Sequence, residues 1–198
     1  KLAGLTAIAG LFVAGTASAQ ITGTDHDLRS RLTINEICVV CHAPHNNLSA
    51  PGELLWNHSP TTQTFTAYTS PTLDGTSSGP GETSLLCLGC HDGVVAVDSY
   101  GGSTGTDLIT GAAAFGADLS DDHPVGITYD PVADTELQAT TNPVTFGSGA
   151  GTVADMLQAN AVECASCHDV HNTLSAGNAQ LLNVSNVDSE LCFACHNK

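Results

Sequence analysis

The sequence predicts a fold made mostly of irregular loops, with few short helices and strands, wrapped around bound groups instead of a side-chain core. The chain of 198 residues contains 20 glycines and only 5% aromatic residues, so an ordinary aliphatic core is hard to build from it. Its eight cysteines all fall in four copies of one short motif, Cys-x-x-Cys-His. Covalent attachment at these motifs would supply the apolar bulk that the side chains lack.

Each Cys-x-x-Cys-His motif is typical of a covalent c-type haem attachment site. Two thiols at this spacing can each form a thioether with one vinyl group of the same porphyrin, and the adjacent His becomes the proximal iron ligand. The sequence therefore predicts a multihaem cytochrome c with four stacked haem c groups. The attachment residues are Cys38 and Cys41, Cys87 and Cys90, Cys164 and Cys167, and Cys192 and Cys195, and the proximal ligands are His42, His91, His168 and His196.

Other uses of paired cysteines agree less well with the pattern. The four pairs could form two zinc sites of four thiolates each, but zinc does not require a His after every second Cys. A redox dithiol of the thioredoxin type would occur once, within a βαβ pattern that this sequence lacks. No cysteine remains outside the motifs to form a long-range disulfide.

An internal repeat divides the chain into two dihaem modules. The string Cys-x-x-Cys-His-x-x-His-Asn-x-Leu-Ser-Ala begins at Cys38 and again at Cys164, and Leu-Trp-Asn or Leu-Leu-Asn follows at the same spacing. Before the second site of each module, Ser-Leu-Leu-Cys at 84–87 matches Ser-Glu-Leu-Cys at 189–192. The predicted organisation is an export signal at 1–19, an N-terminal arm at 20–36, module 1 at 37–92, a Gly/Ser/Thr-rich linking wrap at 93–162 and module 2 at 163–198.

Residues 1–19 have the pattern of an export signal. Lys1 precedes an apolar run from Leu2 to Val13, and Ala17-Ser18-Ala19 is a small-residue cleavage pattern. The run is too short and too rich in Gly and Ala for a good membrane span. Because c-type haem is attached outside the cytoplasm, export agrees with the haem motifs. We expect an exported protein, extracellular or at the cell surface, with the periplasm as the alternative.

Outside the motifs, local patterns predict few regular elements. The arm from Ile21 to Arg31 has no strong periodicity and is expected to be extended and free. Residues Val94–Val97 and Gly126–Tyr129 are expected to be short strands. Residues Val153–Ala161 are expected to form one or two turns of helix, in which Met156 packs against other side chains.

Five further histidines are candidates for the sixth position of the irons: His26, His45, His58, His123 and His171. Five candidates for four irons allow two His ligands at every haem and leave one of His26, His58 and His123 spare. Module 2 has Val184 at the position of His58, so its first haem, on Cys164 and Cys167, is expected to take His123 from within the chain, with His26 as the alternative. His45 and His171 follow a proximal ligand by three residues, too close to reach the far face of their own haem. We therefore expect each to cross to the partner haem of its module. Bis-His ligation lowers the reduction potential relative to Met/His ligation, which indicates low-potential respiration.

The formal net charge of −16 limits the function further. Such a surface repels nucleic acid and anionic lipid, so neither is an expected partner, and stable membrane insertion is not expected. Asp92 and Asp169 directly follow proximal histidines and either orient an imidazole or are exposed acids. No catalytic residue is predicted, and the chain is expected to transfer electrons without being an enzyme. A reductase of nitrogen or sulfur oxyanions, the weaker alternative, would need an open iron.

Several strings beyond the haem motifs carry a family resemblance. They are His26-Asp27-Leu28, Cys-x-x-Cys-His-Ala-Pro-His, Leu55-Trp56-Asn57-His58, Cys-His-Asp-Gly, Asp122-His123-Pro124-Val125 and Cys-His-Asp-Val-His. With them the chain resembles the multihaem outer-membrane cytochromes of metal-reducing bacteria, most closely the tetrahaem type that polymerises into extracellular filaments.

The resemblance implies a loop-rich fold around stacked haems and head-to-tail homopolymers in which a His of one subunit ligates a haem of the next. On that analogy His26 is the expected intersubunit ligand, to the haem on Cys164 and Cys167. The expected function is a conductive filament, or nanowire, that carries respiratory electrons to extracellular acceptors or other redox proteins. The alternative is a monomeric periplasmic tetrahaem shuttle, in which His26 serves its own chain.

Overall fold

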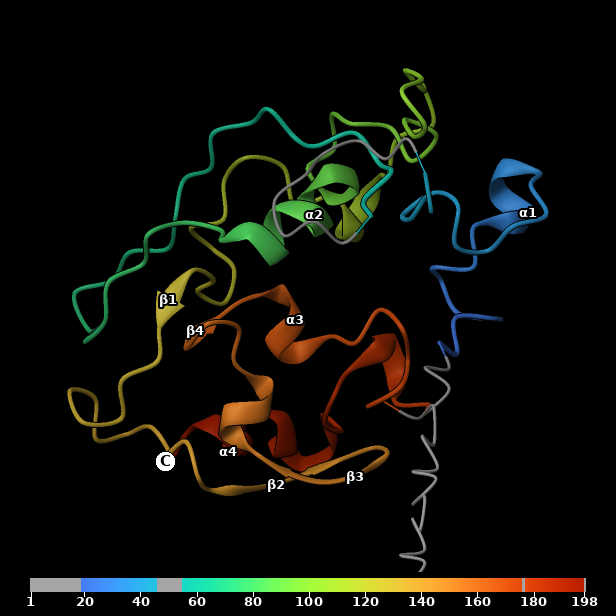
Figure 1. Ribbon diagram of the computed structural model, residues 1–198. Coiled ribbons are helices and arrows are strands. Elements are labelled where there is room, and N and C mark those ends of the chain that lie inside the picture. The colour runs from blue at the N-terminus through green and yellow to red at the C-terminus, as the bar shows by residue number, and fades with distance from the viewer. Residues whose placement is uncertain (1–18, 46–54, 176, 198) are drawn as a thin grey trace, which may run out of the picture.

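The structure, a computed structural model, describes residues 19–45, 55–175 and 177–197 (Figure 1). The predicted export signal therefore lies outside the described residues except for Ala19. Most of the described chain is turn, bend or irregular loop, which confirms the loop-rich fold expected from the sequence. No helix in the described ranges is long and apolar enough to cross a membrane.

The regular elements of the described residues are short, and several of them coincide with the haem motifs. The helices are α1 (Arg29–Leu32), α2 (Glu82–His91), α3 (Cys164–Cys167) and α4 (Glu190–Cys195), with 3-10 turns at Gly111–Ala113, Val153–Met156, Ala179–Leu181 and Val187–Ser189. Strand β1 (Ile127–Thr128) pairs antiparallel with β4 (Ala161–Val162), and β2 (Pro143–Phe146) pairs antiparallel with β3 (Gly149–Thr152). In Figure 1, α2 belongs to one half of the molecule and α3, α4 and the β2–β3 hairpin belong to the other.

A small side-chain core lies beneath the β2–β3 hairpin. Val144 and Phe146 alternate with exposed residues along β2, so both point to the same buried side. They pack with Tyr129, Val153 and Met156, and Met156 is only 1% exposed, which confirms its expected packing role. Most of this core comes from residues 93–162. The linking segment therefore provides much of the apolar interior and is more than a wrap over the haems.

The expected elements of the linking segment are only partly present. Gly126–Tyr129 contains β1, as expected, and Val153–Ala161 contains a single 3-10 turn. The strand expected at Val94–Val97 is absent, and that prediction was wrong. The Asp92 carboxylate accepts hydrogen bonds from the backbone N–H groups of Val94 and Val95, both at 2.9 Å, and this local turn replaces a strand ladder.

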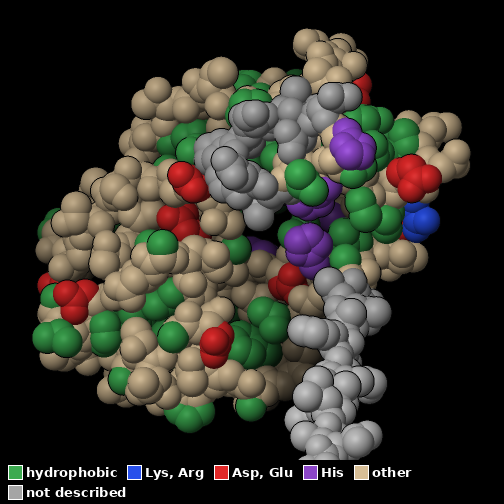
Figure 2. Space-filling model, viewed as in Figure 1, with side chains coloured by type: hydrophobic (Ala, Val, Ile, Leu, Met, Phe, Trp, Pro, Cys, Tyr) green, Lys and Arg blue, Asp and Glu red, His purple; other side chains and the backbone are tan. Residues whose placement is uncertain are grey.

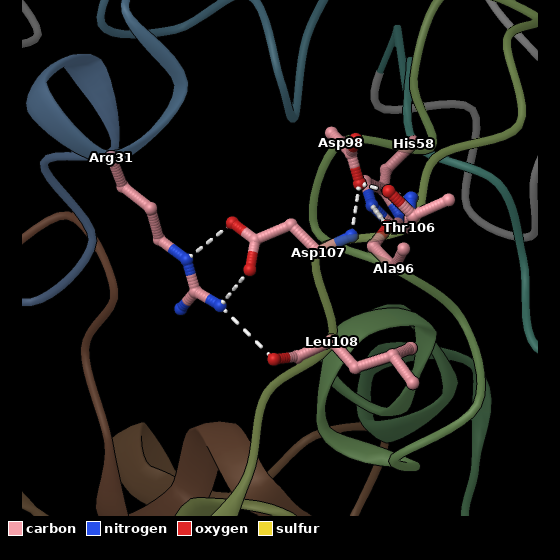
Figure 3. A network of polar contacts seen from close by, with 7 residues as sticks. All are labelled: Arg31, His58, Ala96, Asp98, Thr106, Asp107 and Leu108. Atoms are coloured by element: carbon pink, nitrogen blue, oxygen red, sulfur yellow. Dashed lines mark hydrogen bonds and ion pairs between the residues drawn. The ribbon is translucent and has the colours of Figure 1, made fainter.

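The N-terminal arm is folded onto its own chain, which corrects the expectation of an extended, free segment. Its backbone turns repeatedly before α1. Gln20 donates its backbone N–H to the carbonyl of His171 at 2.7 Å. Arg31 forms two hydrogen bonds with the Asp107 carboxylate, at 2.6 and 2.7 Å, and a third with the carbonyl of Leu108 (Figure 3). The arm is thus attached both to module 2 and to the linking segment.

Candidate haem-attachment sites

Helix α2 shows how a Cys-x-x-Cys-His motif is presented. Cys87 and Cys90 lie three residues apart, so they project from the same side of the helix, and His91 is its last residue. Gly89 lies between them because the backbone carbonyl of Ser59 would be 3.1 Å from a Cβ at this position. The Nδ1 atom of His91 is 2.7 Å from the carbonyl of Ala113. An N–H donated at Nδ1 leaves Nε2 available to bind iron.

The two motifs of module 2 have the same construction on shorter helices. Cys164 and Cys167 are the ends of α3, and His168 follows in an extended conformation that turns it away from the helix axis. His196 follows α4 in the same way. The Nδ1 atom of His168 is 2.9 Å from the carbonyl of Gln180, so its Nε2 is also left for a metal.

None of the eight cysteines forms a disulfide. Among the described residues, no group of three or more His, Cys, Asp or Glu side chains is arranged to hold a metal ion.

The thiols of successive motifs are neighbours. The Cys87 and Cys164 thiols interact directly, which raises the pKa of Cys87 and lowers that of Cys164. Burial, followed by the nearby Cys41, raises the pKa of Cys90 to about 12. Burial, followed by the nearby Cys195, raises the pKa of Cys167 to about 11. These thiols are therefore close enough to affect one another's ionisation.

Three of the proximal histidines face a second histidine ring. The ring centroids are 6.1 Å apart for His42 and His171, 6.2 Å for His91 and His26, and 6.4 Å for His196 and His123. Two metal–nitrogen bonds of about 2 Å, with about 1 Å from each nitrogen to its ring centre, give about 6 Å between the centroids of two imidazoles on one iron. Figure 2 shows histidine side chains gathered on one face, where the two halves of the molecule meet.

His26, His123 and His171 are placed differently from expectation, and the ring of His123 lies beside that of His196 where His168 was expected. Burial and the neighbouring His91 lower the pKa of His26, which favours the neutral imidazole that binds metals. His26 thus faces a proximal ligand of its own chain. His171 was expected to serve its own module, but its ring lies opposite that of His42 of module 1.

Asp169 organises the backbone of the loop that carries His171. Its carboxylate accepts the backbone N–H groups of His171, Thr173 and Leu174 at 3.0, 2.5 and 2.6 Å. Burial opposes the ionisation of this carboxyl, but the hydrogen bonds from Leu174 and Thr173 outweigh it and hold its pKa below the usual value. Asp169 therefore shapes the loop that carries His171, and Asp92 shapes a turn. Neither acid has the imidazole-orienting or exposed role expected for it.

The remaining candidates, His45 and His58, have opposite environments. His45 is exposed, borders the undescribed residues 46–54, and has no ring partner among the described residues. His58 is fully buried, and its two ring nitrogens lie 3.0 Å from the carbonyls of Ser59 and Ala96. The described residues likewise place no histidine ring opposite His168.

Two asparagines that the sequence analysis did not single out hold the first motif of each module. The Asn57 side-chain amide donates to the carbonyl of Val39 at 2.6 Å. Asn183 occupies the same repeat position and donates to the carbonyl of Ala165 at 3.1 Å. Their backbone N–H groups bind the carbonyls of the second cysteines, at 2.9 Å for Asn57 and 2.8 Å for Asn183. The signal was present in the repeat, since both asparagines lie 19 residues after the first Cys.

Two buried polar atoms without protein partners fit a haem beside these residues. The indole N–H of Trp56 has no hydrogen-bond partner, and its ring lies edge-on to His42 with 5.9 Å between centroids. The Nδ1 atom of His26 also lacks a partner. A haem propionate is an acceptor of the kind that a buried N–H needs. With the free thiols and the paired imidazoles, the donor set fits c-type haem.

Comparison with known families supports this chemistry in module 2. A family model described as the doubled CXXCH motif matches residues 158–198, which contain α3, α4 and both motifs of that module. None of the curated proteins compared with the chain matches it. The match indicates covalent c-type haem binding at paired motifs, and with it an electron-transfer protein.

Proposed function

We propose that this chain transfers electrons through four c-type haems, each attached at one Cys-x-x-Cys-His motif and ligated by two histidines. The pairing of histidine rings carries the proposal: His42, His91 and His196 each have a second ring 6.1–6.4 Å away. Bound haem supplies reversible one-electron exchange between ferrous and ferric iron. Two imidazole ligands at one iron leave no position for a substrate and favour a low potential, which suits electron transfer better than reduction of a substrate.

The ring pairs and the repeat together suggest all four distal ligands. We assign His171 as the second ligand of the iron bound by His42, and His26 as the second ligand of the iron bound by His91. His123 is the second ligand of the iron bound by His196. His45 is the repeat counterpart of His171, so if His171 crosses to the first site of module 1, symmetry sends His45 to the first site of module 2. In that case His45 ligates the iron of His168. The spare histidine is then His58, whose ring nitrogens lie 3.0 Å from two backbone carbonyls and whose Nε2 is 3.4 Å from the sulfur of Cys90.

The order of the thiols supports one continuous electron path. Because the Cys87 and Cys164 thiols interact, the second site of module 1 adjoins the first site of module 2. The neighbouring pairs Cys41 with Cys90, and Cys167 with Cys195, join the sites within each module. The electrons would therefore pass along the chain from one module to the other.

We further propose that the chain is the subunit of an exported head-to-tail filament. Cys38 and Cys192 begin the first and last motifs, and they are the two cysteines that are exposed. A second copy that set its Cys38 site against Cys192 would repeat the junction that Cys87 and Cys164 form inside one chain. Such a contact does not close on itself and generates a filament. Because His26 faces His91 of its own chain, the candidate for a ligand donated to a neighbour becomes the exposed His45.

Electron microscopy of the secreted holoprotein tests the filament. We expect filaments, and only monomers at high concentration would contradict the proposal. His45→Ala separates two roles of His45. If His45 ligates a haem of a neighbouring subunit, the variant forms no filaments and one haem changes from low-spin to high-spin. If His45 ligates a haem of its own chain, one haem becomes high-spin but the filaments still form. His26→Ala is the matched control, expected to change one haem spectrum and leave assembly intact.

A monomeric shuttle is the second candidate, and the folded arm favours it. Gln20 and His26 both contact their own chain, as expected for an arm that serves its own subunit. The shuttle predicts a single species of monomer mass in light scattering at every concentration, whereas the filament predicts growth with concentration.

A further inference from the structure

One buried carboxylate joins the two modules where their haem-bearing helices meet. Glu163 directly precedes α3 and is 6% exposed. Its two carboxylate oxygens accept the backbone N–H of Gly81 at 3.1 and 3.2 Å, and one of them also accepts the hydroxyl of Ser84. The backbone carbonyl of Glu163 accepts the backbone N–H of Ser166, in the first turn of α3, at 2.9 Å, and its own backbone N–H is donated to the Ser166 hydroxyl at 3.0 Å. Glu163 therefore binds the first turns of both helices.

Ser84 completes the connection from the side of α2. Its side chain is fully buried, and its hydroxyl accepts the backbone N–H of Cys164 at 3.0 Å while donating to Glu163. The hydrogen bond therefore reaches the first cysteine of the third motif itself. Ser84 and Glu163 lie 79 residues apart in sequence, so this contact joins two distant parts of the chain.

The Glu163 carboxylate caps helix α2 from a distant part of the sequence, unlike an ordinary helix cap, in which the N-cap residue supplies the acceptor. The N-cap residue of α2 is Gly81, which has no side chain to cap the helix, and the capping acceptor comes from 82 residues away. A Cβ at Gly81 would collide with the carboxylate, so glycine permits the close approach. Every neighbour of the carboxylate is a donor, which is the arrangement that an anion requires when it is buried.

We propose that Glu163 is a positioning residue for electron transfer between the modules. It fixes the site on Cys87 and Cys90 against the site on Cys164 and Cys167, and it places one negative charge between them. This inference rests on the proposed function, because the junction matters for electron transfer only if both sites hold haem. A buried anion stabilises nearby ferric iron, so it lowers the potentials of the two sites that it adjoins.

The chain itself offers matched controls for the two residues. Glu82 is in the first turn of α2 and is exposed, so Glu82→Gln removes the same charge without touching the junction. Ser189 is the repeat counterpart of Ser84 and is exposed, so Ser189→Ala removes the same hydroxyl before the fourth motif.

A redox titration of the holoproteins tests the role of the charge. In Glu163→Gln, we expect two of the four one-electron steps to move to higher potential and the other two to superimpose on those of the wild type. Glu82→Gln should titrate like the wild type. Identical titration curves for Glu163→Gln and Glu82→Gln would overturn the inference. A wild-type protein that takes up fewer than four electrons would instead contradict the proposed function.

Hydrogen exchange tests the connection independently, including the case in which Glu163→Gln loads fewer haems. Ser84→Ala should speed exchange in the first turns of both α2 and α3 by about tenfold, the factor for one lost buried hydrogen bond. Ser189→Ala should leave both turns unchanged. Faster exchange in α2 alone would show that the two helices are not coupled through this contact, and the positioning role would be excluded.

Discussion

Replacement of Asn183 by Asp should destabilise the third haem loop without changing its volume. Asn183 is 2% exposed, and its amide nitrogen donates to the carbonyls of Ala165 and Ser166, both at 3.1 Å. Aspartate has nearly the same shape but carries no donor when ionised. Both carbonyls therefore lose a partner, and a buried anion is placed against them.

The magnitude follows from the number of bonds lost. Each buried hydrogen bond contributes about 1 kcal/mol, and the unpaired carbonyls and new buried charge add a similar amount, so Asn183→Asp should cost about 3 to 4 kcal/mol. Asn57→Asp removes one such bond, to Val39 at 2.6 Å, and should cost about 2 to 3 kcal/mol. For a chain of this size, about 3 kcal/mol corresponds to a fall in Tm of about 6 to 12 °C.

Differential scanning calorimetry of the holoproteins measures the effect, with haem content determined on the same samples. Asn186→Asp, at an exposed position, is the control and should melt within about 1 °C of the wild type. Asn186→Asp should have the highest melting temperature of the three variants, Asn57→Asp an intermediate one and Asn183→Asp the lowest. The reasoning is refuted if Asn183→Asp retains all its haems and melts with the control.

Three further predictions follow from the histidines and the arm. His171→Ala should convert one haem, the one ligated by His42, to a high-spin form that binds carbon monoxide, detected by absorption and electron paramagnetic resonance spectra. His58→Gln should keep every haem low-spin and lower only the melting temperature, since its ring faces carbonyls; a new high-spin signal would make it a ligand. Arg31 hydrogen-bonds Asp107 and holds the pKa of that carboxyl below its usual value. The contact is therefore present above the usual pKa of an aspartate and is lost as pH falls through the lowered pKa. Proteolysis of the arm should therefore accelerate in acid, and Asp107→Asn should remove this pH dependence.

The sequence predicted local features of the fold and the sites well. Cys87, Cys90 and His91 lie as the motif spacing requires, because three- and four-residue separations on a helix fix their side. The loop-rich architecture follows from the many glycines and few aromatics. The repeat also contained the two asparagines, since an amide that recurs in register after a ligand string indicates a structural role at both positions.

Long-range placements could not be predicted in the same way. The residue that His171 faces depends on how module 2 packs against module 1, and nothing within three residues of it specifies that contact. The strand predicted at Val94–Val97 failed for a different reason, which is local in the sequence. There, a short-range competitor, the carboxylate of Asp92, captured the backbone donors that a ladder would have used. Apolar alternation alone did not reveal this competition.

In the proposed sites, haem attachment depends on residues that are adjacent in sequence, whereas the second iron ligand comes from a distant part of the chain. Each pair of thioether cysteines lies within four residues, so covalent attachment at one motif needs no other part of the chain. The second ligands come from elsewhere: His171 of module 2 faces His42 of module 1, and His26 of the arm faces His91. The cap of α2 is likewise supplied by Glu163. In the proposed assignment neither module supplies both ligands of any of its irons, so we expect the final ligand set to form only once the two modules pack together.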